Sequence, residues 1–261
     1  MFRRTRAEHR VALLPYVMSG FPTIEATPDL VERLVDAGAD GLELGVPFSD
    51  PMADGPTIQR ASQRALENGV TSRVALDLLE KARARVNVPI ALMGYVNPIA
   101  RFGYREYCRA AASAGADALI VPDVPPEESE ELGGAVEAAG LDLVAFIAPT
   151  TSDARLRLAG RVARGFIYCV SVTGVTGARL TLNTELAGML ARARAVTTTP
   201  LVVGFGISRP EHVTWLVGRA DGAIVASALI DAMDAAPNDP FPAAAAIVET
   251  LRRAGSAAAT G

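Results

Sequence analysis

Two carboxylic acids in the first quarter of the chain are candidates for acid–base chemistry. Glu43 lies within the apolar run Gly41–Gly45, and Asp54 lies in the proline-rich loop that follows, before a helix predicted over Pro56–Glu67. A buried carboxylate is costly to remove from water, so Glu43 requires either a partner or a chemical function. If both acids face one cavity, they form a general acid–base pair. In the structural alternative, Glu43 meets a backbone group and Asp54 caps the helix behind Pro56.

Three glycine-bearing turns in the last third of the chain are candidates for binding an anion. The segment VTGVTGARLT contains Gly174 and Gly177, GFGISRPE contains Gly204 and Gly206, and ASALI places Ser227 at an expected helix start. Free N–H groups at such turns and at helix N-termini bind phosphate. The pattern therefore predicts a phosphorylated substrate, and the alternative is that the glycines only serve tight turns.

Tyrosines and one long segment could complete such a site. Tyr168 lies two residues from Phe166 on a predicted strand, so both side chains point the same way, and Tyr16 lies on the first predicted strand. The phenols could reach a cavity floor, or they could be ordinary core aromatics with hydrogen-bonded hydroxyls. The segment Val172–Leu182 could be a lid over the substrate or a solvated connection.

The elements that position these groups alternate regularly between strand and helix. Short apolar runs predict strands at Val11–Ser19, Gly41–Gly45, Val88–Tyr95, Ala118–Val121, Leu141–Ala148, Phe166–Ser171, Leu201–Gly204 and Gly222–Ala226. Helices are predicted at Pro28–Ala37, Pro56–Glu67, Thr71–Arg85, Tyr104–Ala114, Glu127–Ala139, Asp153–Arg164, Asn183–Ala195, Pro210–Val217 and, interrupted at Pro237–Pro242, at Ile230–Ala254.

This alternation indicates an α/β fold, a single (β/α)8 TIM barrel spanning residues 1–261, with residues 255–261 as a frayed tail. A doubly wound sheet is the alternative, but no GxGxxG motif follows the first strand. In a barrel the loops after the strands form the active face, which places Glu43, Asp54 and the glycine-bearing turns together. Phosphate often binds in the turns after strands seven and eight of such barrels.

The composition argues against several kinds of binding site and catalytic chemistry. The net charge of −4 argues against a nucleic-acid surface, although a local basic patch remains open. Lys81 lies on a polar helical face, and the two histidines, His9 and His212, are too few for a histidine metal site, so neither a Schiff base nor a metal is expected. Cys108 and Cys169 are expected to be reduced, buried thiols. Without a signal peptide or a membrane-length apolar run, we expect a cytoplasmic protein.

The run GLELGVPFSDPMADGPTIQRA resembles the signature of the tryptophan synthase alpha subunit family. The similarity continues through LPYVMSGFP, YVNPIARFG, LIVPDVPPEE, IAPTTSDARL, GFIYCVSVTGVTGAR and VVGFGIS, in the family's order and over nearly the whole chain. The resemblance implies a lyase of L-tryptophan biosynthesis that cleaves indole-3-glycerol phosphate to indole and glyceraldehyde 3-phosphate by a retro-aldol reaction.

The resemblance also implies roles for particular residues. Glu43 would protonate indole C3, and Asp54 would hydrogen-bond the indole N–H as positive charge develops. The implied substrate-binding residues are Tyr16 and Tyr168 in the indole pocket, Thr176 on the lid, and Gly177, Phe205, Gly206, Ala226 and Ser227 around the phosphate. Ala226 departs from the glycine that is common in the family; its backbone donor survives, but its methyl group could weaken phosphate binding.

A partner is implied as well. The family works as an α2β2 heterotetramer with a beta subunit that carries pyridoxal phosphate, so no cofactor is expected in this chain. The implied interface residues lie in the proline-rich loops after strands two, three and four: Pro47, Asp50, Asn97, Pro98, Asp123 and Pro125. Three alternatives stay open: a stand-alone lyase that releases free indole, a catalytically weak allosteric binding subunit, and an aldolase or isomerase acting on another sugar phosphate.

Overall fold

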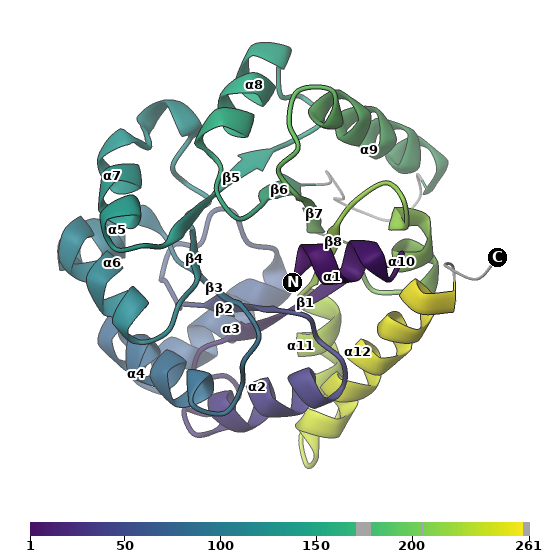
Figure 1. Ribbon diagram of the computed structural model, residues 1–261. Helices are drawn as coiled ribbons and strands as arrows, with labels where there is room; N and C mark the ends of the chain where they lie inside the picture. Colours follow the sequence, from purple (N-terminus) through teal and green to yellow (C-terminus); the bar gives the residue numbers. More distant parts are fainter. Residues whose placement is uncertain (171–178, 205, 258–261) are drawn as a thin grey trace.

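The computed structural model describes residues 1–170, 179–204 and 206–257, and its strands form one closed parallel barrel (Figure 1). The strands are β1 Ala12–Met18, β2 Leu42–Gly45, β3 Ile90–Met93, β4 Ala118–Ile120, β5 Asp142–Ile147, β6 Ile167–Val170, β7 Leu201–Gly204 and β8 Gly222–Val225. They neighbour one another in sequence order, and β1 pairs with β8 to close the ring. The predicted (β/α)8 barrel is confirmed.

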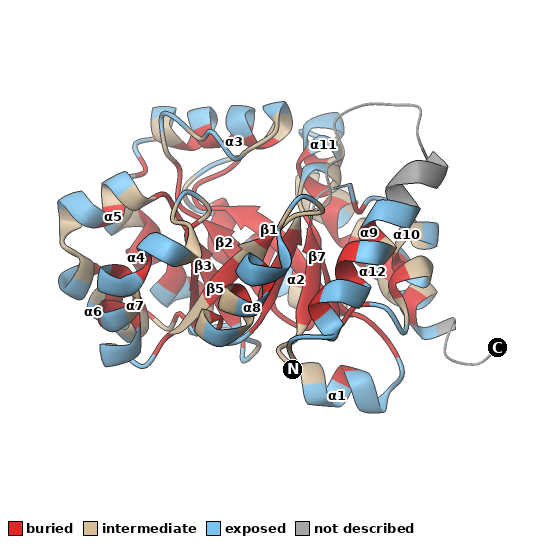
Figure 2. Ribbon diagram, turned by 90° about the horizontal axis from the view of Figure 1, so that it is seen from above, coloured by how far each residue is buried: buried red, intermediate tan, exposed pale blue. Residues whose placement is uncertain are grey.

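Helices surround this barrel on all sides (Figure 1). They are α1 Phe2–Ala7, α2 Ala26–Asp36, α3 Pro56–Glu67, α4 Ser72–Arg83, α5 Val96–Phe102, α6 Tyr104–Ser113, the 3-10 turn η1 Pro126–Glu128, α7 Glu130–Ala138, α8 Asp153–Val162, α9 Arg179–Arg194, α10 Pro210–Leu216, α11 Ser227–Ala235 and α12 Pro240–Ala257. Figure 2 shows buried strands inside and helices whose outer faces are exposed. Helical cover outside and side chains inside explain why the strands are apolar runs without alternation.

Two helices lie where the sequence predicted none. Helix α1 was not predicted, and the segment VNPIARFG, read as a loop, forms α5. Pro98 falls in the first turn of α5, where a missing N–H is tolerated. The Asp123 carboxylate accepts the Val96 N–H at 3.0 and 3.1 Å and so holds the start of the helix. The helix thus depends on a residue from the next strand's loop.

The carboxyl-terminal helices also differ from the prediction. The predicted break at Pro237–Pro242 is shorter, because α11 ends at Ala235 and α12 begins at Pro240. A proline fits the first helical position because its N–H would have no helical partner there. Helix α12 continues through Ala257 and Gly255 is buried, and the frayed tail over residues 255–261 stays a prediction. The remaining tail lies outside the described residues.

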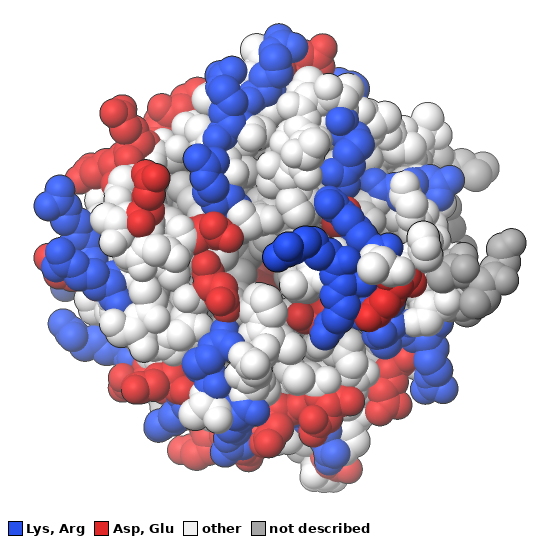
Figure 3. All heavy atoms as spheres, viewed as in Figure 1, with Lys and Arg blue, Asp and Glu red and all other residues white. Residues whose placement is uncertain are grey.

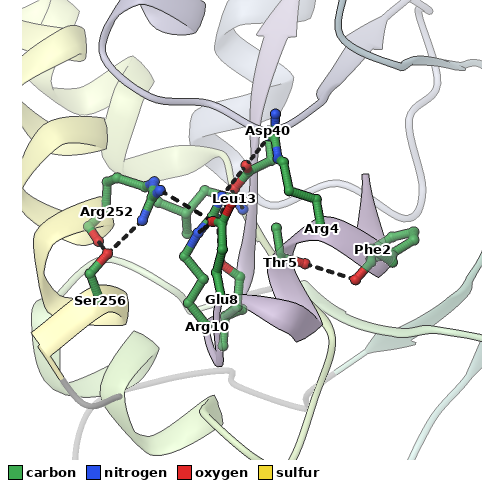
Figure 4. A network of polar contacts seen from close by, with 10 residues as sticks. Phe2, Arg4, Thr5, Glu8, Arg10, Leu13, Asp40, Arg252 and Ser256 are labelled. Carbon is green, nitrogen blue, oxygen red and sulfur yellow. Dashed lines mark hydrogen bonds and ion pairs between the residues drawn. The ribbon is translucent and has the colours of Figure 1, made fainter. Parts of the chain in front are cut away.

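A buried carboxylate ties the beginning of the chain to the barrel at the amino-terminal ends of the strands (Figure 4). Asp40, 2% exposed, accepts hydrogen bonds from Arg10 Nη1 and Nη2 at 2.5 and 2.8 Å, from Arg4 at 2.6 Å and from the Leu13 N–H at 3.1 Å. Burial alone would raise the pKa of Asp40, but the hydrogen bonds from Arg10 and Leu13 outweigh it and lower that pKa. The ion pair between Asp40 and Arg10 therefore stabilises the folded state at pH values above the pKa that Asp40 has in the unfolded chain.

We expect Asp40→Asn to lower the free energy of unfolding by about 3 kcal/mol, because it leaves the Arg10 guanidinium buried without its full counter-charge. Urea denaturation at pH 7 measures this loss. Since the folded pKa of Asp40 is lowered, the difference between wild type and variant is present near neutral pH and vanishes as pH falls through that pKa. Asp29→Asn is the control, because it breaks only an exposed pair with Arg85. Equal losses in the two variants would contradict the prediction.

Candidate active site

One cavity of about 550 Å³ gathers most of the predicted site residues. Its lining includes Tyr16, Glu43, Asp54, Tyr168, Gly206, Ala226 and Ser227. The loop before α3 and the start of α11 line it, and Figure 2 shows both helices at the end of the barrel opposite α1. Its size suits a small molecule. Thr176, Gly177 and Phe205 lie outside the described residues, as does most of the predicted lid, so their roles stay predictions.

Glu43 stands on β2 at the bottom of this cavity. It pairs in register with Tyr16 on β1 and with Ala91 on β3, and it is 3% exposed. Its Oε2 atom has no hydrogen-bond partner among the described residues. Burial, with a smaller contribution from the charge of Asp54, raises the pKa of Glu43 to about 8. The side chain therefore holds a proton at neutral pH and can deliver it to a ligand.

Asp54 faces the same cavity from the loop after β2. The Tyr95 hydroxyl donates a hydrogen bond to Asp54 Oδ2 at 3.0 Å and accepts one from the Ala53 N–H at 3.1 Å. Burial raises the pKa of Asp54 to about 6, and the Tyr95 hydrogen bond opposes that rise. The N-cap of α3 is Gly55, so the alternative in which Asp54 caps this helix is wrong. Asp54 is mostly ionised at pH 7, whereas Glu43 is mostly protonated.

Tyr95 itself was missed by the sequence reasoning, which considered only the tyrosines of the first and sixth predicted strands, Tyr16 and Tyr168. Its only signal is its position directly after β3, at the active face of the barrel. The ring also lies 5.2 Å from that of Phe48, which belongs to the same loop as Asp54. Tyr95 thus joins the end of β3 to the loop that carries Asp54.

We expect Tyr95→Phe to move the acid limb of the pH dependence of kcat/KM to higher pH, because Asp54 loses a donor that stabilises its ionised form. At pH 7 the value should fall about tenfold, the scale of one charge-assisted hydrogen bond. Steady-state rates between pH 5 and 9 (roughly the span over which carboxylates with raised pKa values titrate) measure both effects. Tyr104→Phe, on α6 away from the cavity, is the control. A loss of rate without movement of the acid limb would contradict this role.

Aromatic and apolar side chains form the cavity wall. Phe146 on β5 stacks on Tyr168 of β6, with ring centroids 4.9 Å apart and an angle of 21° between the planes. The other apolar side chains of the lining are Ala53, Pro56, Ile58, Met93, Ile120, Pro122, Val170, Ile207 and Ile224. This wall suits a planar aromatic ligand.

Two glycines leave the space that the cavity tyrosines occupy. A Cβ placed on Gly204 would lie 2.2 Å from the Tyr168 ring, and one on Gly45 would lie 2.1 Å from the Tyr16 hydroxyl. Both distances are far inside van der Waals contact, so these positions require glycine as long as the tyrosines keep their places. The sequence reasoning treated Gly204 only as part of a phosphate-binding turn.

The opposite corner of the cavity offers backbone donors for an anion. Helix α11 begins at Ser227 with Ala226 as N-cap, as predicted, and Gly206 has a positive φ of 78° that favours glycine. The first N–H groups of a helix lack helical partners and carry the positive end of the helix dipole. The described lining residues include no lysine, arginine or histidine. Among the described residues, only N–H groups and hydroxyls are therefore placed to hold an anion in this corner.

The predicted partner residues lie in the segments that follow β2, β3 and β4, and two of them, Asn97 and Pro98, belong to helix α5. Asp50, Asn97 and Asp123 are exposed, Pro98 and Pro125 are half-buried, and Pro47 is buried in the isolated chain. Pro47 therefore offers little surface to a partner in this state. The nearby Met52 is 94% exposed, which the sequence reasoning did not notice.

Within residues 1–170, 179–204 and 206–257, no helix combines the length and apolar character needed to cross a membrane. The same residues contain no cluster of three or more His, Cys, Asp or Glu side chains placed to hold a metal ion.

Comparisons with known proteins agree with the geometry. Residues 2–258 match the family described as "Tryptophan synthase alpha chain". The alpha chain of Roseiflexus castenholzii is 52% identical over 96% of this chain and 97% of its own length, and that of Chloroflexus aurantiacus is 51% identical over 96% and 95%. The solved alpha subunit from Legionella pneumophila superposes with a TM-score of 0.89 at 37% identity, covering 97% of this chain and 95% of its own. A chain of tryptophan synthase from M. tuberculosis gives 0.88 at 33% identity, with 97% of each chain covered. The chain therefore belongs to the tryptophan synthase alpha chain family.

Proposed function

We propose that Glu43 and Asp54 are the proton donor and the charge-stabilising group of the reaction that this chain catalyses, the cleavage of indole-3-glycerol phosphate to indole and glyceraldehyde 3-phosphate. The observation that carries the proposal is the separation of their pKa values, about 8 for Glu43 and about 6 for Asp54, within one cavity. Two carboxylic acids whose surroundings push their pKa values apart divide naturally into an acid and an anion.

The reaction breaks the bond between indole C3 and the first carbon of the glycerol phosphate chain. Glu43 transfers its proton to C3, and the resulting positive charge spreads onto the ring N–H, which donates a hydrogen bond to the Asp54 carboxylate. The hydroxyl on the chain carbon then loses its proton, a carbonyl forms, and the bonding electron pair returns to the ring as neutral indole. We assign that second proton to Glu43, which is ionised after the first step, so the acid is regenerated in each cycle.

The rest of the cavity fits the two ends of this substrate. The stacked pair Phe146 and Tyr168 offers an aromatic face to the indole ring. The start of α11 at Ser227, together with Gly206, offers N–H groups to the phosphate. Ala226 adds a methyl group beside this corner, and we expect weaker phosphate binding at most. Burial raises the pKa of both Tyr16 and Tyr168 well above the ordinary value, so neither phenol competes as an anion.

Relatives of this chain occur in tryptophan synthase complexes, and we propose that it pairs with a beta subunit as an α2β2 heterotetramer. The exposed Asp50 and Met52 lie in the loop that carries Asp54, and the exposed Asn97 and Asp123 follow β3 and β4. Exposed residues after three neighbouring strands favour a partner that covers this end of the barrel. Pyridoxal phosphate would then belong to the partner. We place the complex in the cytoplasm, where the free thiols of the chain would stay reduced.

Indole release from indole-3-glycerol phosphate tests the proposal, measured with the purified chain alone and with a beta subunit. Strong stimulation by the beta subunit supports the synthase-subunit assignment. Equally fast release without it would instead indicate a stand-alone lyase. No release under either condition would overturn the catalytic assignment and leave a binding subunit.

A further inference from the structure

A second cavity, of about 510 Å³, opens between three segments that precede the barrel strands: α1 with the turn to β1, the end of α9, and the turn from α10 to β8. Positive side chains gather over α1 on this face (Figure 3). The cavity is lined by Arg6, Arg10, Arg194 and Arg219, with His9 at the edge and Asp221 as its one acidic residue among those described. Helix α1 lies at the end of the barrel opposite α3 and α11 (Figure 2), and the linings of the two cavities share no residue, so this cavity is separate from the substrate cavity.

The one acidic residue described in this cavity already accepts hydrogen bonds from two arginines. Asp221 is 7% exposed and accepts hydrogen bonds from Arg6 Nε at 2.6 Å, from Arg194 Nη2 and from the Leu201 N–H at 2.8 Å. Two guanidinium groups therefore divide one negative charge. Arg194 Nη1 also donates to the Thr199 carbonyl at 3.2 Å, and the N–H groups of Arg6 and Arg194 that are left over can bind another anion.

The neighbouring ion pairs around Asp40 and Glu8 do not neutralise the positive charge that lines the cavity. Arg10 pairs with Asp40 and Glu8, but Arg4 also binds Asp40 and Arg252 also binds Glu8 (Figure 4). Burial and then the charge of Arg10 lower the pKa of Arg252, as expected where cations outnumber anions. The two networks together contain five arginines and three carboxylates.

Arg219 contributes most directly to this surplus. No ion pair joins it to a carboxylate among the described residues. Its Nη1 donates to the Trp215 carbonyl at 2.8 Å, and its guanidinium carbon lies 5.0 Å from the centroid of the Trp215 ring. The tryptophan thus holds the guanidinium in place without neutralising it.

We propose that this cavity binds a compact polyvalent phosphate: a diphosphate or triphosphate group, either free or carried by a nucleotide. Arginine presents its donors in a planar fork that matches two phosphate oxygens, and several forks from separate segments can share one polyanion. The volume is in the range of sites for small ligands. This assignment is independent of the function proposed for Glu43 and Asp54.

The test is calorimetric titration of the full chain with inorganic pyrophosphate, with sodium chloride added to keep ionic strength constant. Arg219→Gln removes the unpaired guanidinium while leaving every ion pair in place, and we expect it to weaken pyrophosphate binding about tenfold. Thr198→Asp, which adds a negative charge to the exposed rim, should weaken binding comparably and serves if Arg219→Gln folds poorly. Arg105→Gln, an exposed arginine of α6 far from the cavity, is the matched control. A parallel titration with ADP distinguishes a nucleotide from the free diphosphate.

Binding that is weakened about tenfold in both cavity variants and kept in the control, with indole release unchanged, supports the proposal. Absence of binding to the wild-type chain would overturn it. Equal affinity in wild type, Arg219→Gln and Thr198→Asp would also overturn it, because the anion would then occupy the phosphate corner near Ser227 instead. Circular dichroism of each variant confirms folding.

Discussion

Glu43→Gln is expected to lower kcat for indole release by about a thousandfold, because the amide keeps the shape of the side chain but has no acidic proton for indole C3. General acid catalysis by a positioned side chain contributes about 10² to 10⁴ in rate. KM should change little, since the apolar wall and the phosphate corner are untouched. Steady-state indole release with and without the beta subunit measures both constants, and a loss in kcat below about tenfold would contradict the role.

The same variant has a second expected effect that separates loss of chemistry from loss of fold. Because burial raises the folded pKa of Glu43 to about 8, the wild-type chain loses stability as pH rises from the ordinary glutamate value through 8. Glutamine never ionises, so Glu43→Gln should be more stable than wild type at pH 8 and equal to it near pH 4. Urea denaturation at these two pH values measures the difference. A variant that is inactive and also less stable at pH 8 would have lost its fold rather than its acid.

Asp54→Asn is expected to lower kcat/KM by about 10² to 10³, the scale found when one preorganised group is removed from a developing charge. Its clearest signature is in the pH dependence. In the wild type, activity should fall below about pH 6, where Asp54 gains a proton, and above about pH 8, where Glu43 loses one. Without Asp54 the lower limb disappears. The upper limb moves to lower pH, because the charge of Asp54 contributes to the raised pKa of Glu43.

The matched control is Asp50→Asn, in the same loop but exposed to solvent. It removes the same charge without touching the cavity, so the pH dependence of the isolated chain should not change. A lower limb that persists near pH 6 in Asp54→Asn would assign that titration to another group. The prediction would then fail even if the rate fell.

The barrel could be predicted from the sequence because the patterns that indicate each strand and helix lie within one short segment. The short apolar runs alternate with helical stretches, several of which end at glycine, and eight repeats leave few folds to choose from. Helices α1 and α5 were missed because what holds them is distant in sequence. Helix α1 packs Phe2 on Phe166 at 6.2 Å and binds Asp40 through Arg4, whereas α5 begins at the carboxylate of Asp123. Neither contact leaves a periodic pattern in the segment itself.

The residues of the candidate site differ in the same way: some could be predicted from the local sequence, and others depend on distant contacts. Glu43 and Asp54 could be predicted because an acid in an apolar strand and an acid in the next loop are conspicuous by residue type. Phe146 could not, because its role depends on the strand register that places Tyr168 opposite it. Tyr95 could not either, because its role depends on a contact with the loop of Asp54, which is distant in sequence. Register in a parallel barrel is set by the packing of all strands together, which one sequence does not display.

Closure of the ring between β1 and β8 has a consequence for synthesis on the ribosome. Strand β1 is made first, yet its partner β8 is separated from it by most of the chain, and Arg252 reaches Glu8 only once α12 exists. Until then one edge of β1 has no strand beside it, and such edges pair readily with other chains. Contacts this distant also slow folding. The nascent chain is therefore most exposed to aggregation just before its last quarter emerges, and premature termination in that quarter should yield insoluble fragments rather than smaller enzymes.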